Sequence, residues 1–199
     1  MPVETRENPT DAHRHLRTDN QLAGLINQHG YLVLQPAEDP FRRLVKAIAR
    51  QQVSMASAAA TWERLTDAFA VTPNKIRDAE PTELQGVGLS AAKAEYTKTA
   101  AEAFDERNWS RDSFADLSDE AVIEELTEIR GIGPWTAKMF LQFGLGRSDV
   151  FPVEDLGIRQ AVTELYGVES RAAMREQAEV WAPYRSIGSL YLWRAGDEK

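Results

Sequence analysis

One stretch of the sequence combines glycines, a proline and polar side chains in a spacing that could bind an anion. Residues 126–141 read LTEIRGIGPWTAKMFL, with Gly131 and Gly133 one residue apart and Pro134 where a new helix would begin. Glycines allow positive φ and a close backbone approach, and the N–H groups at a helix start favour a phosphate. The segment predicts a helix-hairpin-helix turn that holds a nucleic-acid backbone without reading sequence. An ordinary tight turn between packed helices could carry the same glycines, but the preceding Leu-x-x-Ile, the following Thr-Ala and a downstream aspartate favour the first interpretation.

That aspartate is Asp155, in the stretch VFPVEDLGIR over residues 150–159. Phe151 and Pro152 predict an extended approach, and Asp155 stands where the next helix should begin. An aspartate there is usually an N-cap. The same geometry keeps a carboxylate ionised, so that it could stabilise a cationic transition state or orient a water. The spacing alone leaves both roles open.

The elements that must position these residues are predicted to be helices nearly throughout. Alanine is abundant, and no segment keeps a period-2 alternation beyond a few residues. Asp39 and Pro40 predict an N-cap and first residue of a helix through Ile48, whereas residues 31–35 fit either a strand or an extended connector. Trp62 and Trp109 are expected to be core residues. Other helices are expected near residues 22–29, 58–69, 90–108, 119–128, 134–143, 155–166, 170–181 and 183–195.

The composition excludes several classes of site. The 199 residues include 31 acidic and 23 basic side chains, a net charge of −8 and no cysteine. The chain is long enough to bury a core without covalent staples, and disulfides, zinc fingers, iron–sulfur clusters and thiol nucleophiles are excluded. A net charge of −8 argues against a nucleic-acid partner. However, residues 129–194 hold eight basic and seven acidic residues, so we expect the acidic surface to lie on faces that do not bind DNA.

No segment has the sequence of a membrane or export signal. The first 20 residues are polar and charged, without an apolar core for a signal peptide. No apolar run approaches the ~20 residues that a transmembrane helix needs. We expect a soluble, cytoplasmic, prokaryotic protein, with its activity at the nucleoid and no membrane partner.

The hairpin and its downstream aspartate resemble the helix-hairpin-helix (HhH-GPD) DNA glycosylase superfamily, and in particular its 3-methyladenine DNA glycosylase II branch. The resemblance runs from about residue 20 to residue 195 and also covers three further stretches: PF…AI…QQVS over residues 40–54, GLS…KA over 88–94, and W-x-PYRS over 181–186. It implies an all-α fold, a two-lobed helical bundle with the active-site cleft between the lobes. We expect a polar N-terminal segment, 1–20, and one glycosylase domain, 21–199, with discontinuous lobes and the hairpin at 126–141.

The resemblance also assigns roles to individual residues. Asp155 matches the catalytic aspartate that stabilises the oxocarbenium-like sugar and helps a water attack C1′. Trp135 stands where relatives with lyase activity carry a lysine, which implies a monofunctional enzyme. The substrate pocket would include Trp135, Met139 and Trp193, and Gln52 matches the side chain that fills the gap left by a flipped base. Contacts to DNA are expected from Arg130, Gly131, Ile132, Gly133, Thr136 and Lys138, with Arg159 as a further candidate for phosphate.

The activity implied by this resemblance is hydrolysis of the N-glycosidic bond of alkylated purines, 3-methyladenine and 7-methylguanine, in double-stranded DNA. A cationic alkylated base suits an aromatic pocket and flips out at a cost of a few kcal/mol. We expect a monomer with no cofactor and no metal held by side chains, although hairpin carbonyls hold a monovalent cation in the family. The alternatives are a non-catalytic helix-hairpin-helix DNA-binding protein, a glycosylase for deaminated or oxidised bases, and a helical interaction domain.

Overall fold

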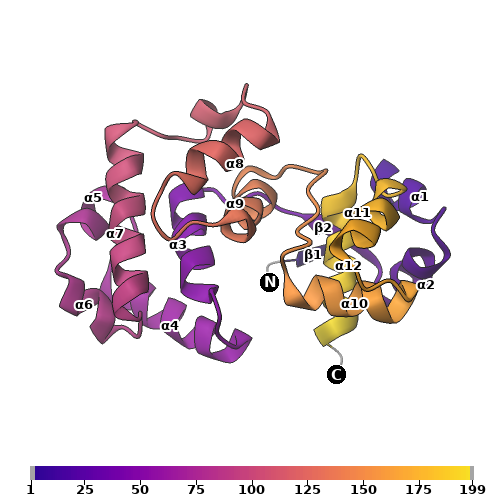
Figure 1. The fold of residues 1–199 in the computed structure, drawn as a ribbon, viewed down its shortest axis with the longest axis horizontal. Coiled ribbons are helices and arrows are strands. Elements are labelled where there is room, and N and C mark those ends of the chain that lie inside the picture. Colours follow the sequence, from indigo (N-terminus) through magenta and orange to yellow (C-terminus); the bar gives the residue numbers. More distant parts are fainter. Residues whose placement is uncertain (1–2, 198–199) are drawn as a thin grey trace. The chain divides into compact units, whose positions relative to one another are not determined.

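The computed structural model describes residues 3–197, and helices make up most of it (Figure 1). The expected all-α architecture is confirmed, with one short two-stranded sheet in addition. The first two residues of the expected segment 1–20 and the last two of the expected domain 21–199 lie outside the described residues. Within residues 3–197 no helix combines the length and the apolar character needed to cross a bilayer.

The chain forms two compact units. The first contains the described residues up to Pro36 and from Gly146 onward, and the second contains Ala37–Leu145. Elements of the first unit are β1 (Val3–Arg6), α1 (Asp11–Leu16), α2 (Asn20–His29), β2 (Tyr31–Leu34), α10 (Leu156–Tyr166), α11 (Arg171–Glu179) and α12 (Arg185–Asp197). Elements of the second are α3 (Pro40–Arg50), α4 (Met55–Ala68), α5 (Pro73–Asp78), α6 (Pro81–Gly86), α7 (Ala91–Glu106), the 3₁₀ turn η1 (Asp112–Phe114), α8 (Asp119–Thr127), α9 (Pro134–Phe140) and the π-helical turn η2 (Leu141–Leu145).

The first unit is organised around α12, which packs against α10, α2 and β2. Trp181 and Tyr191 are its largest fully buried side chains. The carboxylate of Asp19, the N-cap of α2, accepts hydrogen bonds from the Tyr166 hydroxyl at 2.9 Å and the Trp181 indole at 3.0 Å. Burial, and then the nearby Asp19 charge, raises the pKa of Tyr166. One aspartate therefore links the end of α10 to α2 and to the segment before α12.

Residues 31–34 form the strand that the sequence left open, because a partner strand pairs with them. β1 and β2 are antiparallel, with Val3 opposite Leu34 and Arg6 opposite Tyr31. Beneath the sheet, the fully buried His13 ring is bonded on both sides. Its Nδ1 accepts from the Thr10 backbone N–H at 3.0 Å, and its Nε2 donates to the Leu32 carbonyl at 2.9 Å. This arrangement requires the neutral imidazole, because a protonated Nδ1 could not accept.

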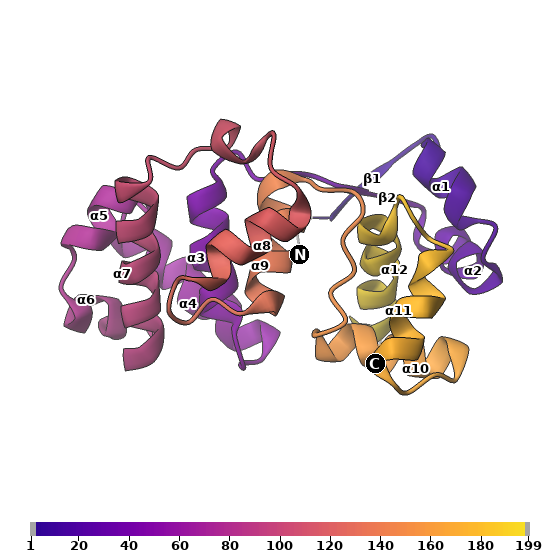
Figure 2. The ribbon, with the colours of Figure 1, turned by 45° about the horizontal axis from the view of Figure 1, so that its top comes forward.

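The second unit is organised around α3, which packs against α7, α9, α4 and η2, with α7 and α9 on different sides of it in Figures 1 and 2. Its core is an aromatic cluster of Phe41, Phe104, Phe114 and Phe140, whose ring centroids lie 5.1–6.3 Å apart. Trp109 lies at the edge of this cluster, under the Arg107 guanidinium.

The expectation that Trp62 is a core residue is wrong. Its ring is only half-buried, and the cations of Arg42 and Lys46 lie 5.4 and 5.2 Å from the ring centroid. α4 turns this position outward, so the indole packs under charged side chains of α3 instead of under apolar ones.

The predicted helix starts are confirmed where a capping side chain precedes them. Asp39 accepts from the backbone N–H of Arg42 at 3.1 Å, with Pro40 as the first helical residue. Ser118 caps α8 in the same way, through the backbone N–H of Ala121 at 3.2 Å. These bonds satisfy N–H groups that have no partner within the helix.

His13 should make the stability of the protein depend on pH. Burial lowers its pKa below the ordinary value of 6.5, against an opposing effect of the bond to Leu32. Protonation therefore favours the unfolded chain, and the stabilisation is complete above the unfolded pKa and lost as pH falls below it. We expect the free energy of unfolding, measured by denaturant titration from about pH 7.5 to about pH 5.5, to fall across this window.

The control for this prediction is the variant His13→Gln. It keeps a donor toward Leu32 but cannot titrate, so its stability should change much less with pH. Equal pH dependence in wild type and His13→Gln would contradict the prediction.

Candidate active site and DNA-binding hairpin

Asp155 is the N-cap of α10, as its place in the sequence predicted. Its Oδ1 accepts a hydrogen bond from the backbone N–H of Ile158 at 3.0 Å and a second from Nε1 of Trp193 at 3.0 Å. The carboxylate is half-buried. The helix N-terminus and the indole both place positive partial charge against it. A fixed carboxylate of this kind can stabilise positive charge that develops nearby.

Gly157 leaves the space in which Asp155 and Trp193 meet. A Cβ at this position would lie 3.2 Å from Oδ1 of Asp155 and 3.6 Å from Cδ1 of Trp193. Any side chain here would therefore press on the hydrogen-bonded pair.

The segment that leads to Asp155 is anchored in the core of the first unit. Phe151 packs edge to face on Trp181, with ring centroids 5.7 Å apart, and Val153 is fully buried. The guanidinium of Arg159 donates to the backbone carbonyl of Glu154 at 2.6 Å. This bond holds the turn behind Asp155, and Arg159 thereby acquires a structural role in addition to the phosphate contact expected from sequence.

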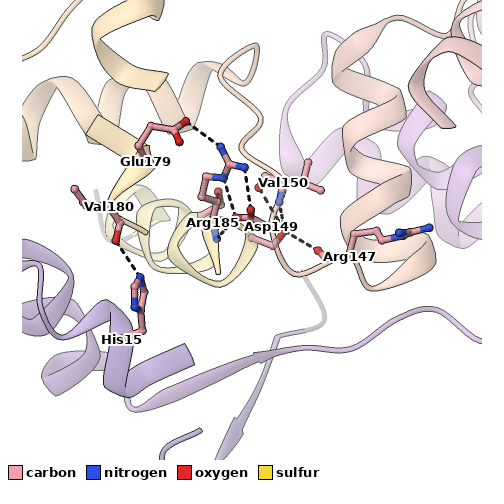
Figure 3. A network of polar contacts seen from close by, with 9 residues as sticks. His15, Arg147, Asp149, Val150, Glu179, Val180 and Arg185 are labelled. Atoms are coloured by element: carbon pink, nitrogen blue, oxygen red, sulfur yellow. Dashed lines mark hydrogen bonds and ion pairs between the residues drawn. The ribbon is translucent and has the colours of Figure 1, made fainter. Parts of the chain in front are cut away.

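A polar network fixes the start of the same segment (Figure 3). Arg185 donates from Nε and Nη2 to the two carboxylate oxygens of Asp149, at 2.8 and 2.9 Å, and from Nη1 to Glu179 at 3.1 Å. Next to it the Ser186 hydroxyl accepts from the backbone N–H of Val150 and donates to the carbonyl of Arg147. The Arg-Ser pair of the PYRS stretch thus ties residues 147–150 to the start of α12.

The hairpin between α8 and α9 contains two glycines, and the backbone conformation requires glycine at one of them. Gly131 has φ of +85°, and a Cβ there would lie 2.0 Å from Cγ of the Tyr96 ring. Gly133, the N-cap of α9, has φ of −99° and nothing within 4 Å of a Cβ. Of the two glycines, which both allow positive φ, only Gly131 adopts it. Gly133 instead keeps the approach to the start of α9 open.

Gln51 holds the hairpin to α3. Its side-chain Nε2 donates to the carbonyl of Gly131 at 2.9 Å and to Oγ1 of Thr136 at 3.0 Å. Thr136 was expected to contact DNA, but its side chain is buried and its hydroxyl accepts the hydrogen bond from Gln51. Sequence reasoning missed this role of Gln51, and the only local signal was its place in the Gln-Gln pair that directly follows α3.

The turn after Gln51 is exposed and conformationally unusual. Gln52 has φ of +53°, a value that non-glycine residues rarely adopt. The Val53 and Met55 side chains that follow are 43% and 50% exposed. Strained backbone with uncovered apolar side chains is typical of a binding loop.

These features agree with the comparisons with known proteins. The model of the HhH-GPD superfamily of base excision DNA repair proteins matches residues 45–184. The chain belongs to this superfamily.

Relatives and solved structures extend the similarity over most of the chain. YfjP of Bacillus subtilis is 31% identical over an alignment of 186 residues, which covers 87% of this chain and 65%, just under two thirds, of YfjP. DNA-3-methyladenine glycosylase 1 of Schizosaccharomyces pombe is 33% identical over 79% of this chain and 72% of its own length. The structure of a 3-methyladenine DNA glycosylase from Schizosaccharomyces pombe in complex with abasic DNA superposes with a TM-score of 0.85 at 31% identity, covering 94% of this chain and 97% of that one.

The remaining candidate residues of this HhH-GPD protein lie in α9 and beside it. Trp135 and Lys138 are half-buried, and Met139 is buried at 2% exposure. Arg130 is an exposed side chain that pairs with Glu95 of α7. The structure thus brings Asp155 and Trp193 together in the first unit, and places Gln52 with the hairpin residues, Trp135 and Met139 in the second.

The hairpin offers neutral oxygen ligands for the monovalent cation that the family resemblance implies. The carbonyls of Ile129, Gly131 and Gly133 each accept one hydrogen bond, from Ile132, Gln51 and Ala137. A carbonyl oxygen has two lone pairs, so this donor set fits a weakly bound monovalent ion. Among residues 3–197 no cluster of three or more His, Asp or Glu side chains could hold a metal ion.

The two hairpin glycines should respond differently to alanine. Gly131→Ala forces a Cβ into the Tyr96 ring at a positive φ, so we expect it to destabilise the protein by about 2–5 kcal/mol. Gly133→Ala should cost about 1 kcal/mol or less, the effect of replacing a glycine N-cap. Thermal or denaturant unfolding of both variants checks this, and similar losses would contradict the assigned geometry.

Proposed function

We propose that this protein is a monofunctional DNA glycosylase that acts as a monomer on double-stranded DNA and hydrolyses the N-glycosidic bond of alkylated purines. The observation that carries the proposal is the Asp155 carboxylate, held on one oxygen by the start of α10 and by the Trp193 indole. The names of the relatives, DNA-3-methyladenine glycosylases, support the substrate class.

In this mechanism Asp155 stabilises the sugar as the base leaves. The glycosidic bond breaks with its electron pair on the departing base, and positive charge develops on the deoxyribose at C1′. The fixed carboxylate lowers the energy of that charge without reorganising. A cationic alkylated base thereby leaves as a neutral molecule. A water then adds its oxygen to C1′ with the help of Asp155; one of its protons stays on the new hydroxyl of the abasic sugar and the other passes to solvent.

The second unit supplies DNA binding in this proposal. The open approach at Gly133 and the backbone N–H groups beyond it would receive a phosphate, with Lys138, Arg130 and a monovalent cation on the hairpin carbonyls adding positive charge. Ile132 is buried beneath the turn and shapes it. Trp135, in place of a lysine, offers a ring to an alkylated base and no amine for a Schiff base, which would make the enzyme monofunctional.

The turn at Gln52 would enter the duplex when the target nucleotide flips out. Its exposure and positive φ project it from the end of α3, and the exposed Val53 adds apolar surface beside it. Filling the vacated space offsets part of the unstacking cost of a few kcal/mol.

Substitution of Asp155 tests the proposed chemistry. Asn is as good an N-cap as Asp, so Asp155→Asn should keep the fold but lose the charge. We expect release of 3-methyladenine from methylated duplex DNA to fall by about 10²–10³-fold, measured by chromatography of the released base, while affinity for the DNA is retained.

Equal release by wild type and Asp155→Asn would contradict the catalytic role. Release by neither protein, with DNA binding intact in both, would favour a non-catalytic helix-hairpin-helix DNA-binding protein. Parallel substrates with a deaminated or an oxidised base test the alternative specificity.

Trp193 should act on the rate through Asp155. Trp193→Phe keeps a ring that can stack on a base but removes the Nε1–H donor, so kcat should fall about tenfold with little change in KM. If Trp193 only lined a pocket, Phe would preserve kcat. Single-turnover kinetics over a range of enzyme concentrations separates the two outcomes.

A further inference from the structure

One strip of α3 is rich in cations, although the chain as a whole is acidic. Residues 40–62 contain four cations and no acidic residue, although the first 128 residues sum to −8. Eight of the eleven residues of α3 are buried, and the three that are not are Arg42, Lys46 and Arg50. Spaced four residues apart, they form one row along the helix, which we call the α3 cation row.

Two members of this row, Arg42 and Lys46, lack the carboxylate partners that other arginines of this protein have. Among the described residues neither Arg42 nor Lys46 forms an ion pair or a side-chain hydrogen bond. Elsewhere in the second unit arginines pair with acidic side chains, as in Arg77–Asp105, Arg107–Glu125 and Arg130–Glu95. Instead, Arg42 and Lys46 lie over the half-buried ring of Trp62, which α4 presents beside them.

Folding alone does not favour this arrangement. Like charges four residues apart on a helix repel, and Arg42, in the first turn of α3, faces the positive end of the helix dipole. Arg43 adds a fourth charge, 5% exposed and stacked on Phe143 at 4.5 Å. Burial, followed by repulsion from Arg43, Arg50 and Arg42, lowers the pKa of Lys46. A cluster that costs stability points to a ligand that neutralises it.

We propose that Arg42, Lys46 and Trp62 form a second DNA contact, which binds the phosphate backbone of the duplex independently of the hairpin. The row rises about 12 Å along α3, a length over which one DNA strand presents about three phosphates. It leads directly to the exposed turn at Gln52. The proposal deepens the proposed function, because it adds a contact for undamaged flanking DNA to an enzyme that acts on one base.

The alternative is that the two side chains only cover the Trp62 ring with their aliphatic stems. Methionine separates these roles, since it keeps an unbranched apolar chain over the ring and removes the charge. Lys75→Met on α5 is the matched control, because it is the same substitution at an exposed lysine of the same unit outside residues 40–62.

The test measures binding of an unmodified duplex by fluorescence anisotropy at several salt concentrations. Arg42→Met and Lys46→Met should each weaken binding and lower the slope of log K against log salt by about 0.9, while Lys75→Met keeps the wild-type slope. Thermal stability of the two row variants should stay equal or rise, because repulsion is relieved. The proposal would be overturned if wild type and all three variants showed equal salt slopes. If, in addition, the two row variants had a lowered Tm, the row would be assigned to packing.

The outcome of this experiment does not depend on whether the proposed glycosylase function is correct. It uses DNA without a lesion and requires no chemistry, so a protein that releases no alkylated base can still show the expected slopes. Conversely, a wild type that releases 3-methyladenine, with salt slopes untouched by either row variant, would retain the glycosylase assignment and exclude the second contact.

Discussion

The first unit depends on a repeated interaction in which an aspartate caps a helix and also accepts a hydrogen bond from a tryptophan indole. Asp155 does this at the start of α10 with Trp193, and Asp19 does it at the start of α2 with Trp181. Asp19 also accepts from Tyr166, the last residue of α10. Since α10 is held at both ends, the Asp155 carboxylate has a fixed position relative to its own core. The catalytic role proposed for Asp155 needs that rigidity, because electrostatic stabilisation is lost when the charge must reorganise.

Much of this arrangement could be predicted because its signals are local. Three of the helix starts are marked by capping side chains, each of which accepts a hydrogen bond from the backbone N–H three residues further along the chain. These are Asp39, Ser118 and Asp155. The positive φ of Gly131 follows from the hairpin pattern in the same way. In each case the residue type and its immediate neighbours determine the structure, so no knowledge of the rest of the fold is needed.

The remaining features depend on contacts between residues distant in the sequence. The strand at residues 31–34 exists because β1 pairs with it, and Gln51 reaches a hairpin 80 residues further on. Trp62 was expected in the core because aromatic residues at helical spacing usually are, but its environment is set by Arg42 and Lys46 of another helix. The local sequence around each residue does not indicate which distant residue it will contact. These long-range contacts account for the main differences between expectation and structure.

The charge distribution shows why a net charge cannot decide whether a protein binds DNA. In the proposed mode of binding, the hairpin would approach a phosphate through backbone N–H groups, which add nothing to the formal charge. α3 concentrates four cations within nine residues, although the segment that contains it is acidic as a whole. Because salt screens charges beyond about 10 Å, a phosphate bound at α3 as proposed would respond to those cations and much less to acidic groups farther away. The potential at the binding surface, and not the sum of −8, therefore governs association with the duplex.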